Sequence, residues 1–104
     1  MKLSDLGAFI LGHGGEGVSD AQGNPVPYRA GVGVAFMCPC GCRELMGIFF
    51  KNPIDGGQPI DDNDRNLWQR QGDTIENLTL TPSILRRSDC GWHGFITNGQ
   101  IRTV

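Results

Sequence analysis

The chain has 104 residues, a formal net charge of −2, 16 glycines and 6 prolines. A chain of this length forms a single domain with a modest core, so we predict one domain over residues 1–104. The weak negative charge argues against strong nucleic-acid binding, which needs a large positive field. No apolar run approaches the roughly 20 residues of a membrane-spanning helix, so no membrane partner is expected.

The first 30 residues form a segment that precedes the predicted core. The apolar stretch 3–11 is the one part of the N-terminus that could be helical. Residues 12–27 are rich in glycine and contain two prolines, a composition typical of a loop. We therefore place the core in residues 31–104.

A first hairpin is predicted around the CPCGC sequence at 38–42. Residues 31–38 alternate in a period of two, with Val32, Val34 and Phe36 on one face, which is the pattern of a strand. A second apolar run at 45–50 follows at once. The cysteines are therefore expected at the tip of this hairpin.

The second half of the chain also favours strands. Residues 51–66 are polar and predict a long loop, and 66–71 could be a short helix. Residues 74–81 predict a strand that Pro82 stops. Asn98 and Gly99, the preferred pair for a type I′ turn, lie between residues 94–97 and 100–104. We predict a mainly β fold, with a small α+β fold as the alternative, built from zinc-stabilised hairpins with long loops.

Four cysteines and a histidine fall in two short segments, CPCGC at 38–42 and CGWH at 90–93. Structural zinc takes four tetrahedral ligands, usually thiolates and imidazoles presented by tight turns. Without an export signal the cysteines are expected to stay reduced in the cytoplasm, which favours metal over disulfides. We predict a Zn²⁺ site that joins the two hairpins.

Five side chains compete for the four positions of this zinc site. The preferred ligands are Cys38, Cys42, Cys90 and His93. Cys40 is the alternative ligand, which either replaces one of the four or remains a free thiol. Disulfides between neighbours within residues 38–42 would close strained rings.

Three blocks of sequence follow one another: CPCGC at 38–42, TLTPSI at 79–84 and CGWHGFITNGQIR at 90–102. This layout resembles a family of small phage and prophage proteins of unknown function with the pattern CPCGC … TL(S/T)PSI … CGWHG(F/Y). The resemblance implies a phage or prophage origin, a zinc site at the positions above, and a location in the cytosol of the host cell. It implies no established activity.

From these features we expect a non-enzymatic accessory protein whose structural zinc supports loops that contact a host or phage protein. One alternative is a zinc-dependent hydrolase or deaminase-like enzyme, with Glu16 or Glu44 beside an open zinc. The other is a zinc-ribbon nucleic-acid binder, whose binding would depend steeply on salt. Its basic residues would be Arg43, Arg86, Arg87 and Arg102.

Overall fold

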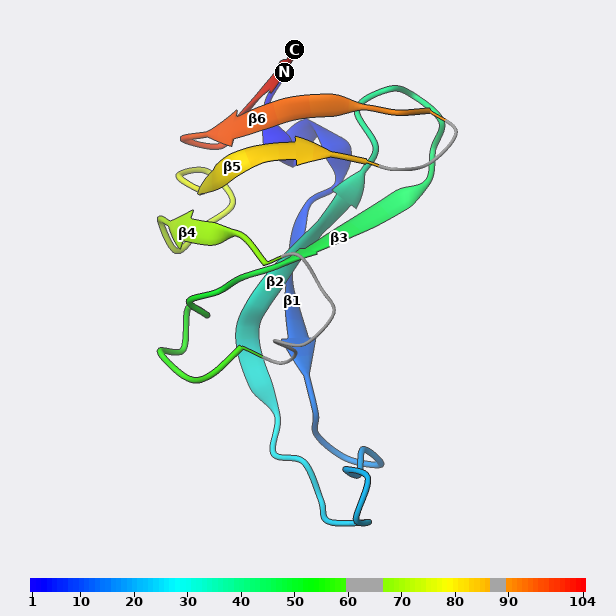
Figure 1. Ribbon diagram of the computed structural model, residues 1–104, viewed down its shortest axis with the longest axis vertical. Helices are drawn as coiled ribbons and strands as arrows, with labels where there is room; N and C mark the ends of the chain where they lie inside the picture. Colours follow the sequence, from blue (N-terminus) through cyan, green and yellow to red (C-terminus); the bar gives the residue numbers. More distant parts are fainter. Residues whose placement is uncertain (60–66, 87–89) are drawn as a thin grey trace.

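The fold is mainly β, as the sequence predicts. A computed structural model describes residues 1–59, 67–86 and 90–104. Two antiparallel sheets follow a short 3-10 turn, η1 (Figure 1). In chain order the elements are η1 Leu3–Leu6, β1 Phe9–His13, β2 Arg29–Met37, β3 Leu45–Phe49, β4 Gln69–Gln71, β5 Thr79–Leu85, β6 His93–Thr97 and β7 Gln100–Thr103.

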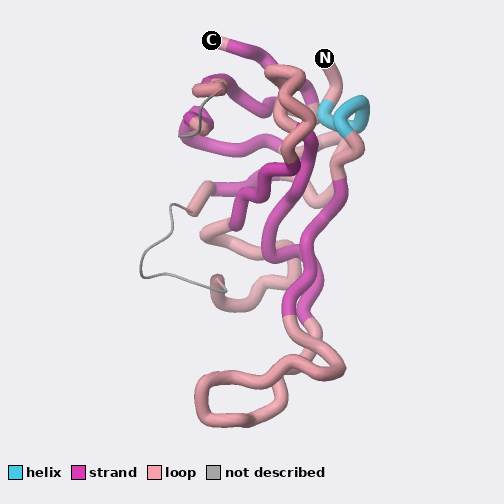
Figure 2. The backbone as a smooth tube through the Cα atoms, turned by 90° about the vertical axis from the view of Figure 1, so that its right-hand side faces the viewer, coloured by secondary structure: helices cyan, strands magenta, loops and turns pink. Residues whose placement is uncertain are grey.

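The first sheet has the strand order β1-β2-β3. The predicted hairpin is confirmed, because β2 pairs with β3 from Gly33 opposite Phe49 to Met37 opposite Leu45, with the cysteines in the turn between them. The β1–β2 arm extends away from the second sheet and ends in the loop at 14–28 (Figures 1 and 2). The helix considered for residues 3–11 is limited to the 3-10 turn η1 at Leu3–Leu6, and the strand β1 replaces its second half. Pairing with β2, such as Ile10 opposite Val34, draws this apolar stretch into the sheet.

The second sheet has the order β4-β5-β6-β7. The predicted hairpin at its C-terminal end is confirmed, and Asn98 and Gly99 both have positive φ angles, 49° and 70°. Residues 69–71 form a strand, not the helix considered for 66–71, and residue 66 lies outside the described residues.

The strand predicted at residues 74–81 begins and ends at the wrong positions. Residues 75–77 form a turn, and β5 begins only at Thr79. Pro82 does not stop the strand but lies within it, after a cis peptide bond with Thr81. An irregularity in the pairing of β5 with β6 accommodates the proline, which has no N–H to donate to a neighbouring strand.

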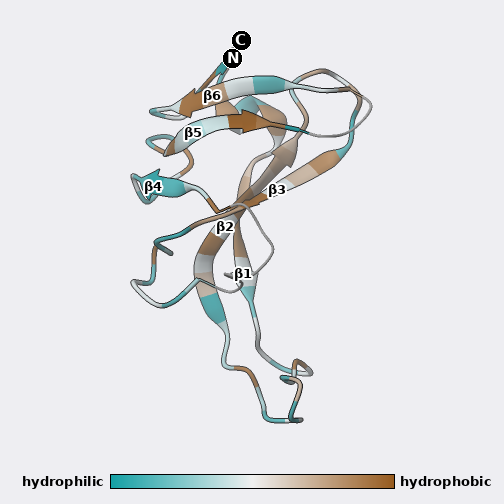
Figure 3. Ribbon diagram, viewed as in Figure 1, coloured by the Kyte–Doolittle hydropathy of each residue, from teal (hydrophilic) through white to brown (hydrophobic). Residues whose placement is uncertain are grey.

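The two sheets share one hydrophobic core. Phe36, Ile48 and Phe50 contribute from the first sheet and its continuation, and Leu80 and Ile96, which lie opposite each other, contribute from the second. Figure 3 shows hydrophobic residues along β2 and β3 and hydrophilic ones on β4. Within the described residues, no helix has the length and apolar character needed to cross a bilayer.

Candidate functional site

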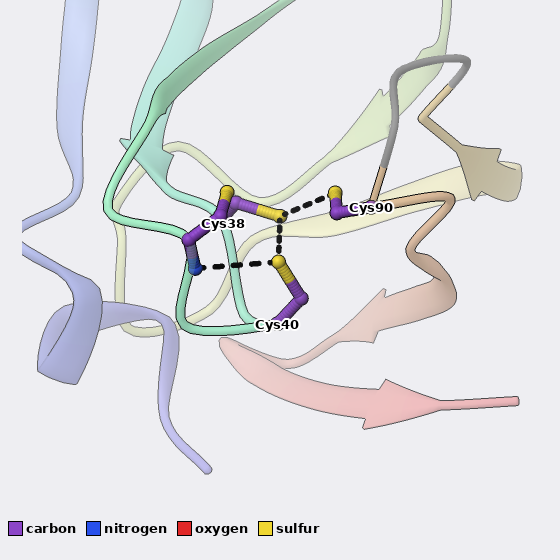
Figure 4. Close-up of side chains that lie close together, drawn as sticks. Cys38, Cys40 and Cys90 are labelled. Atoms are coloured by element: carbon purple, nitrogen blue, oxygen red, sulfur yellow. Dashed lines mark hydrogen bonds between the residues drawn. The ribbon is translucent and has the colours of Figure 1, made fainter.

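The four cysteines converge at the junction of the two sheets. Cys38, Cys40 and Cys42 lie on the turn between β2 and β3, and Cys90 lies just before β6. Their sulfur atoms are all within 4.8 Å of one another. The Cys38 Sγ is 3.3 Å from the Cys40 Sγ and 3.6 Å from the Cys90 Sγ (Figure 4). Cys38, Cys40 and Cys42 carry free thiols.

These distances fit a tetrahedral metal site. Zinc–sulfur bonds of about 2.3 Å place the sulfurs of a tetrahedral site roughly 3.8 Å apart. A disulfide would need about 2.05 Å. Two backbone hydrogen bonds close this turn: the Cys38 N–H donates to the Glu44 carbonyl, and the Gly41 N–H donates to the Cys38 carbonyl. The cluster is therefore consistent with a bound metal ion.

A cation already lies beside the thiols. The Arg86 guanidinium donates to the Cys42 Sγ at 3.2 Å and to the Cys90 Sγ at 3.6 Å, and it forms an ion pair with Glu44. Hydrogen bonds to Cys38, Cys42 and Glu44 raise the pKa of Arg86 above its ordinary value. Arg86 therefore keeps a fixed positive charge against the cluster.

The thiols do not have equal acidity. The hydrogen bond with Cys38 raises the pKa of Cys40 to about 12. The pKa of Cys42 is lowered, first by a backbone hydrogen bond from Glu44 and then by the Cys40 thiol. Neighbouring thiols resist joint deprotonation unless a cation is added, since each thiolate disfavours the next. Such a cluster is suited to a divalent cation.

The structure brings together a set of cysteines that includes Cys40. Cys38, Cys42 and Cys90, three of the preferred ligands, lie in the cluster, and Cys40 completes it. His93 lies elsewhere: its Nε2 atom is 3.0 Å from the Ser83 Oγ. The structure thus separates a four-thiol cluster from a serine–histidine pair.

The serine–histidine pair spans two neighbouring strands. Ser83 lies in β5 and His93 is the first residue of β6, where it is opposite Leu85. Leu80 pairs with Ile96 and Ile84 pairs with Gly94, so the three residues 81–83 lie opposite the single residue 95. Such a bulge re-aims side chains. Here the hydroxyl of Ser83 lies beside the imidazole ring.

Both partners are half-buried and held through the backbone. The Trp68 indole donates to the Ser83 carbonyl at 3.4 Å, and the Val104 N–H donates to the His93 carbonyl at 2.9 Å. The Arg86 N–H donates to the Trp92 carbonyl, which ties the end of β5 to the start of β6. In residues 1–59, 67–86 and 90–104, no carboxylate forms a hydrogen bond with His93, so the described site is a dyad.

Sequence reasoning missed Ser83 as a functional residue and considered His93 only as a ligand. The available signal was the TLTPSI block, which contains a serine ten residues before the histidine of CGWHG. Among the residues of the alternative functions, Glu44 pairs with Arg86, and Arg87 lies outside the described residues.

The comparisons with known proteins point to proteolysis. Residues 20–104 match a family model described as "Bacterial ubiquitination-like system serine protease (BubE)". No curated protein and no solved structure matches significantly. The match overturns the expectation of a non-enzymatic interaction module, because the family is one of enzymes. The match also argues against the zinc-hydrolase and nucleic-acid alternatives, because the family description names a serine protease.

Proposed function

Because the chain belongs to the BubE family of bacterial ubiquitination-like system serine proteases, we propose that it is a serine protease with Ser83 as nucleophile and His93 as general base. The observation that carries this proposal is the 3.0 Å contact between the Ser83 Oγ and the His93 Nε2. A nucleophile and a base within hydrogen-bond reach are the minimum requirement for this chemistry.

The dyad can form an acyl-enzyme. In the neutral tautomer with its proton on Nδ1, His93 accepts a hydrogen bond from the Ser83 hydroxyl through Nε2. As Oγ attacks the substrate carbonyl carbon, its proton passes to Nε2. The C–N bond then breaks, and His93 returns that proton to the departing amine.

Water completes the cycle. His93 takes a proton from a water molecule, whose oxygen attacks the ester carbonyl of the acylated Ser83. The C–O bond to Ser83 breaks, the serine oxygen regains a proton from His93, and a carboxylic acid is released. The substrate class is a polypeptide amide bond, and the family description supports one formed within a ubiquitination-like system.

The thiol cluster has a separate, structural role in this proposal. Cys38, Cys40, Cys42 and Cys90 would hold Zn²⁺, since four thiolates at these distances form a closed tetrahedral site. Held by these four residues, the ion would neutralise their thiolate charge and cross-link the two sheets. We expect close to one zinc per chain when the purified protein is analysed by mass spectrometry for metals.

Labelling with a fluorophosphonate tests the nucleophile. This reagent loses fluoride when an activated serine attacks its phosphorus, so it reports the nucleophile without knowledge of the substrate. We expect one adduct, located by peptide mass spectrometry on Ser83. His93→Ala should slow the labelling, because the hydroxyl then has no base.

The matched control is Ser19→Ala, which removes an exposed serine from the 14–28 loop. It should be labelled like the wild type, whereas Ser83→Ala should not be labelled. Equal labelling of Ser83→Ala and the wild type would refute the assignment of Ser83.

A further inference from the structure

The outer face of the second sheet carries three exposed apolar residues beside the dyad. Leu85, the cross-strand partner of His93, is 51% exposed. Phe95, two residues beyond His93 on β6, is 43% exposed, and Val104 is 71% exposed. Single exposed apolar residues are common on protein surfaces. Three exposed apolar side chains around one histidine indicate a surface that another molecule covers.

A hollow adjoins His93 on this face. It has a volume of about 560 Å³ and is lined by Phe95, Thr97, Arg102, Thr103 and Val104. Val104 connects it to the dyad, since its N–H donates to the His93 carbonyl. Phe95 follows His93 by two strand residues, a separation of roughly 7 Å. An extended chain whose scissile bond lay at Ser83 would therefore reach this hollow if it ran along β6 from His93 toward Phe95.

A cationic side chain, that of Arg102, lines the hollow. Arg102 lies directly opposite Phe95 on β7. Arg29 and Arg86 form ion pairs, and Arg70 donates to backbone carbonyls. No carboxylate in the part of the chain that the structure describes pairs with Arg102. Its charge is thus available to a ligand in the hollow.

We propose that this hollow is a substrate subsite, in which Phe95 contacts an apolar side chain of the polypeptide substrate and Arg102 pairs with an acidic one. The inference rests on the proposed protease function and specifies its substrate class. Adjacent strands place facing side chains about 5 Å apart, so the two recognised residues lie close together in the substrate, within a few residues of the scissile bond.

Inhibition by short peptides tests the subsite. Hydrolysis of p-nitrophenyl acetate reports the dyad, and this small ester does not need the hollow. We expect a hexapeptide of leucine and glutamate to inhibit the wild type more strongly than a matched peptide of leucine and lysine. The ratio of inhibition constants should be about two- to fivefold, the range of one exposed ion pair. Arg102→Glu should reverse the preference, and Phe95→Ser should weaken inhibition by both peptides.

The basal hydrolysis of the ester separates this proposal from the previous one. If Ser83→Ala hydrolyses the ester as fast as the wild type, the protease assignment fails. If Ser83→Ala is inactive but both peptides inhibit equally, if neither inhibits, or if Arg102→Glu keeps the wild-type preference, the subsite is refuted.

A charge-matched variant and a size measurement complete the test. Lys51→Glu makes the same charge change at an exposed position outside the hollow, and it should keep the wild-type preference.

The alternative occupant of the hollow is a second copy of the chain. A wild-type dimer that Phe95→Ser and Arg102→Glu convert to monomers, as measured by sedimentation, would overturn the subsite in favour of self-association.

Discussion

The thiol cluster and the dyad each take one residue from the CGWH segment, Cys90 and His93, which are three positions apart, yet the two sites are built differently. The cluster joins a turn of the first sheet to a segment of the second, and its sulfurs come from residues up to 52 positions apart. The dyad lies within one sheet, on neighbouring strands. A cross-link between sheets contributes mainly to stability, whereas a pair within one sheet can be changed without unfolding it.

The residues of the CGWH segment are divided between the thiol cluster, the core and the dyad. Cys90 belongs to the thiol cluster, Trp92 is buried in the core, and His93 is half-buried beside Ser83. One short segment therefore supplies a thiol, a core residue and a base. If the cluster is structural and the dyad catalytic, changes to each should have separable effects.

The largest expected effect compares His93→Ala with Cys90→Ser. Loss of the base should lower ester hydrolysis by at least about 10³-fold and leave the metal content unchanged. Loss of the thiol should lower the metal content. Both are measured on the same preparations, by p-nitrophenyl acetate hydrolysis and metal analysis. Loss of metal from His93→Ala would mean that His93 is a metal ligand, and it would contradict the separation of the thiol cluster from the dyad.

Metal removal should have the next largest effect. A strong chelator, or Cys38→Ser, is expected to lower the thermal midpoint by more than about 10 °C. Structural zinc contributes several kcal/mol to folding, and 1 kcal/mol shifts the midpoint of a domain of this size by about 4–8 °C. Ser83→Ala, measured by the same calorimetry, should keep the wild-type midpoint. An unchanged midpoint after chelation would mean that the cluster does not support the fold.

Arg86→Gln should have an intermediate effect confined to the cluster. Outer partners of metal ligands typically change metal affinity by about 10- to 100-fold, and Arg86 contacts two of the sulfurs. Competition with a metal-binding dye measures this change. Arg86→Lys should lose less affinity, because it keeps the charge but not the forked geometry. Equal affinities for all three proteins would show that Arg86 does not stabilise the thiolates.

The smallest effect is expected at Asp55, on the loop after β3. Hydrogen bonding to Arg29 lowers the pKa of Asp55 from 3.8 to about 2. A lowered carboxyl pKa stabilises the folded state above about pH 4, and this contribution is lost as the pH falls through about 2. Asp55→Asn should therefore lower the denaturation midpoint slightly at pH 7, and the difference from the wild type should shrink at pH 3. A difference that is independent of pH would exclude the ion pair as its cause.

Much of the fold could be predicted because it depends on local signals. The alternation at 31–38 predicted β2, and the Asn98–Gly99 pair predicted the last hairpin. The end of β5 could not be predicted, because Pro82 remains within the strand only where the pairing with β6 is irregular, between Leu80 and Ile84. The strand β1 was missed because its pairing partners on β2 lie 16 to 26 positions away along the chain.

The sequence by itself indicated that the cysteines would gather, since three thiols in five residues and a fourth three positions before a histidine are typical of a metal site. It also determined the β class through alternation and turn residues. Only the tertiary structure decided that the four cysteine sulfurs lie together and that the imidazole of His93 lies beside the hydroxyl of Ser83. Whether His93 faces a metal or Ser83 depends on the register of β5 against β6, and that register is set by a bulge and by core packing between sheets, not by the spacing of residues along the chain.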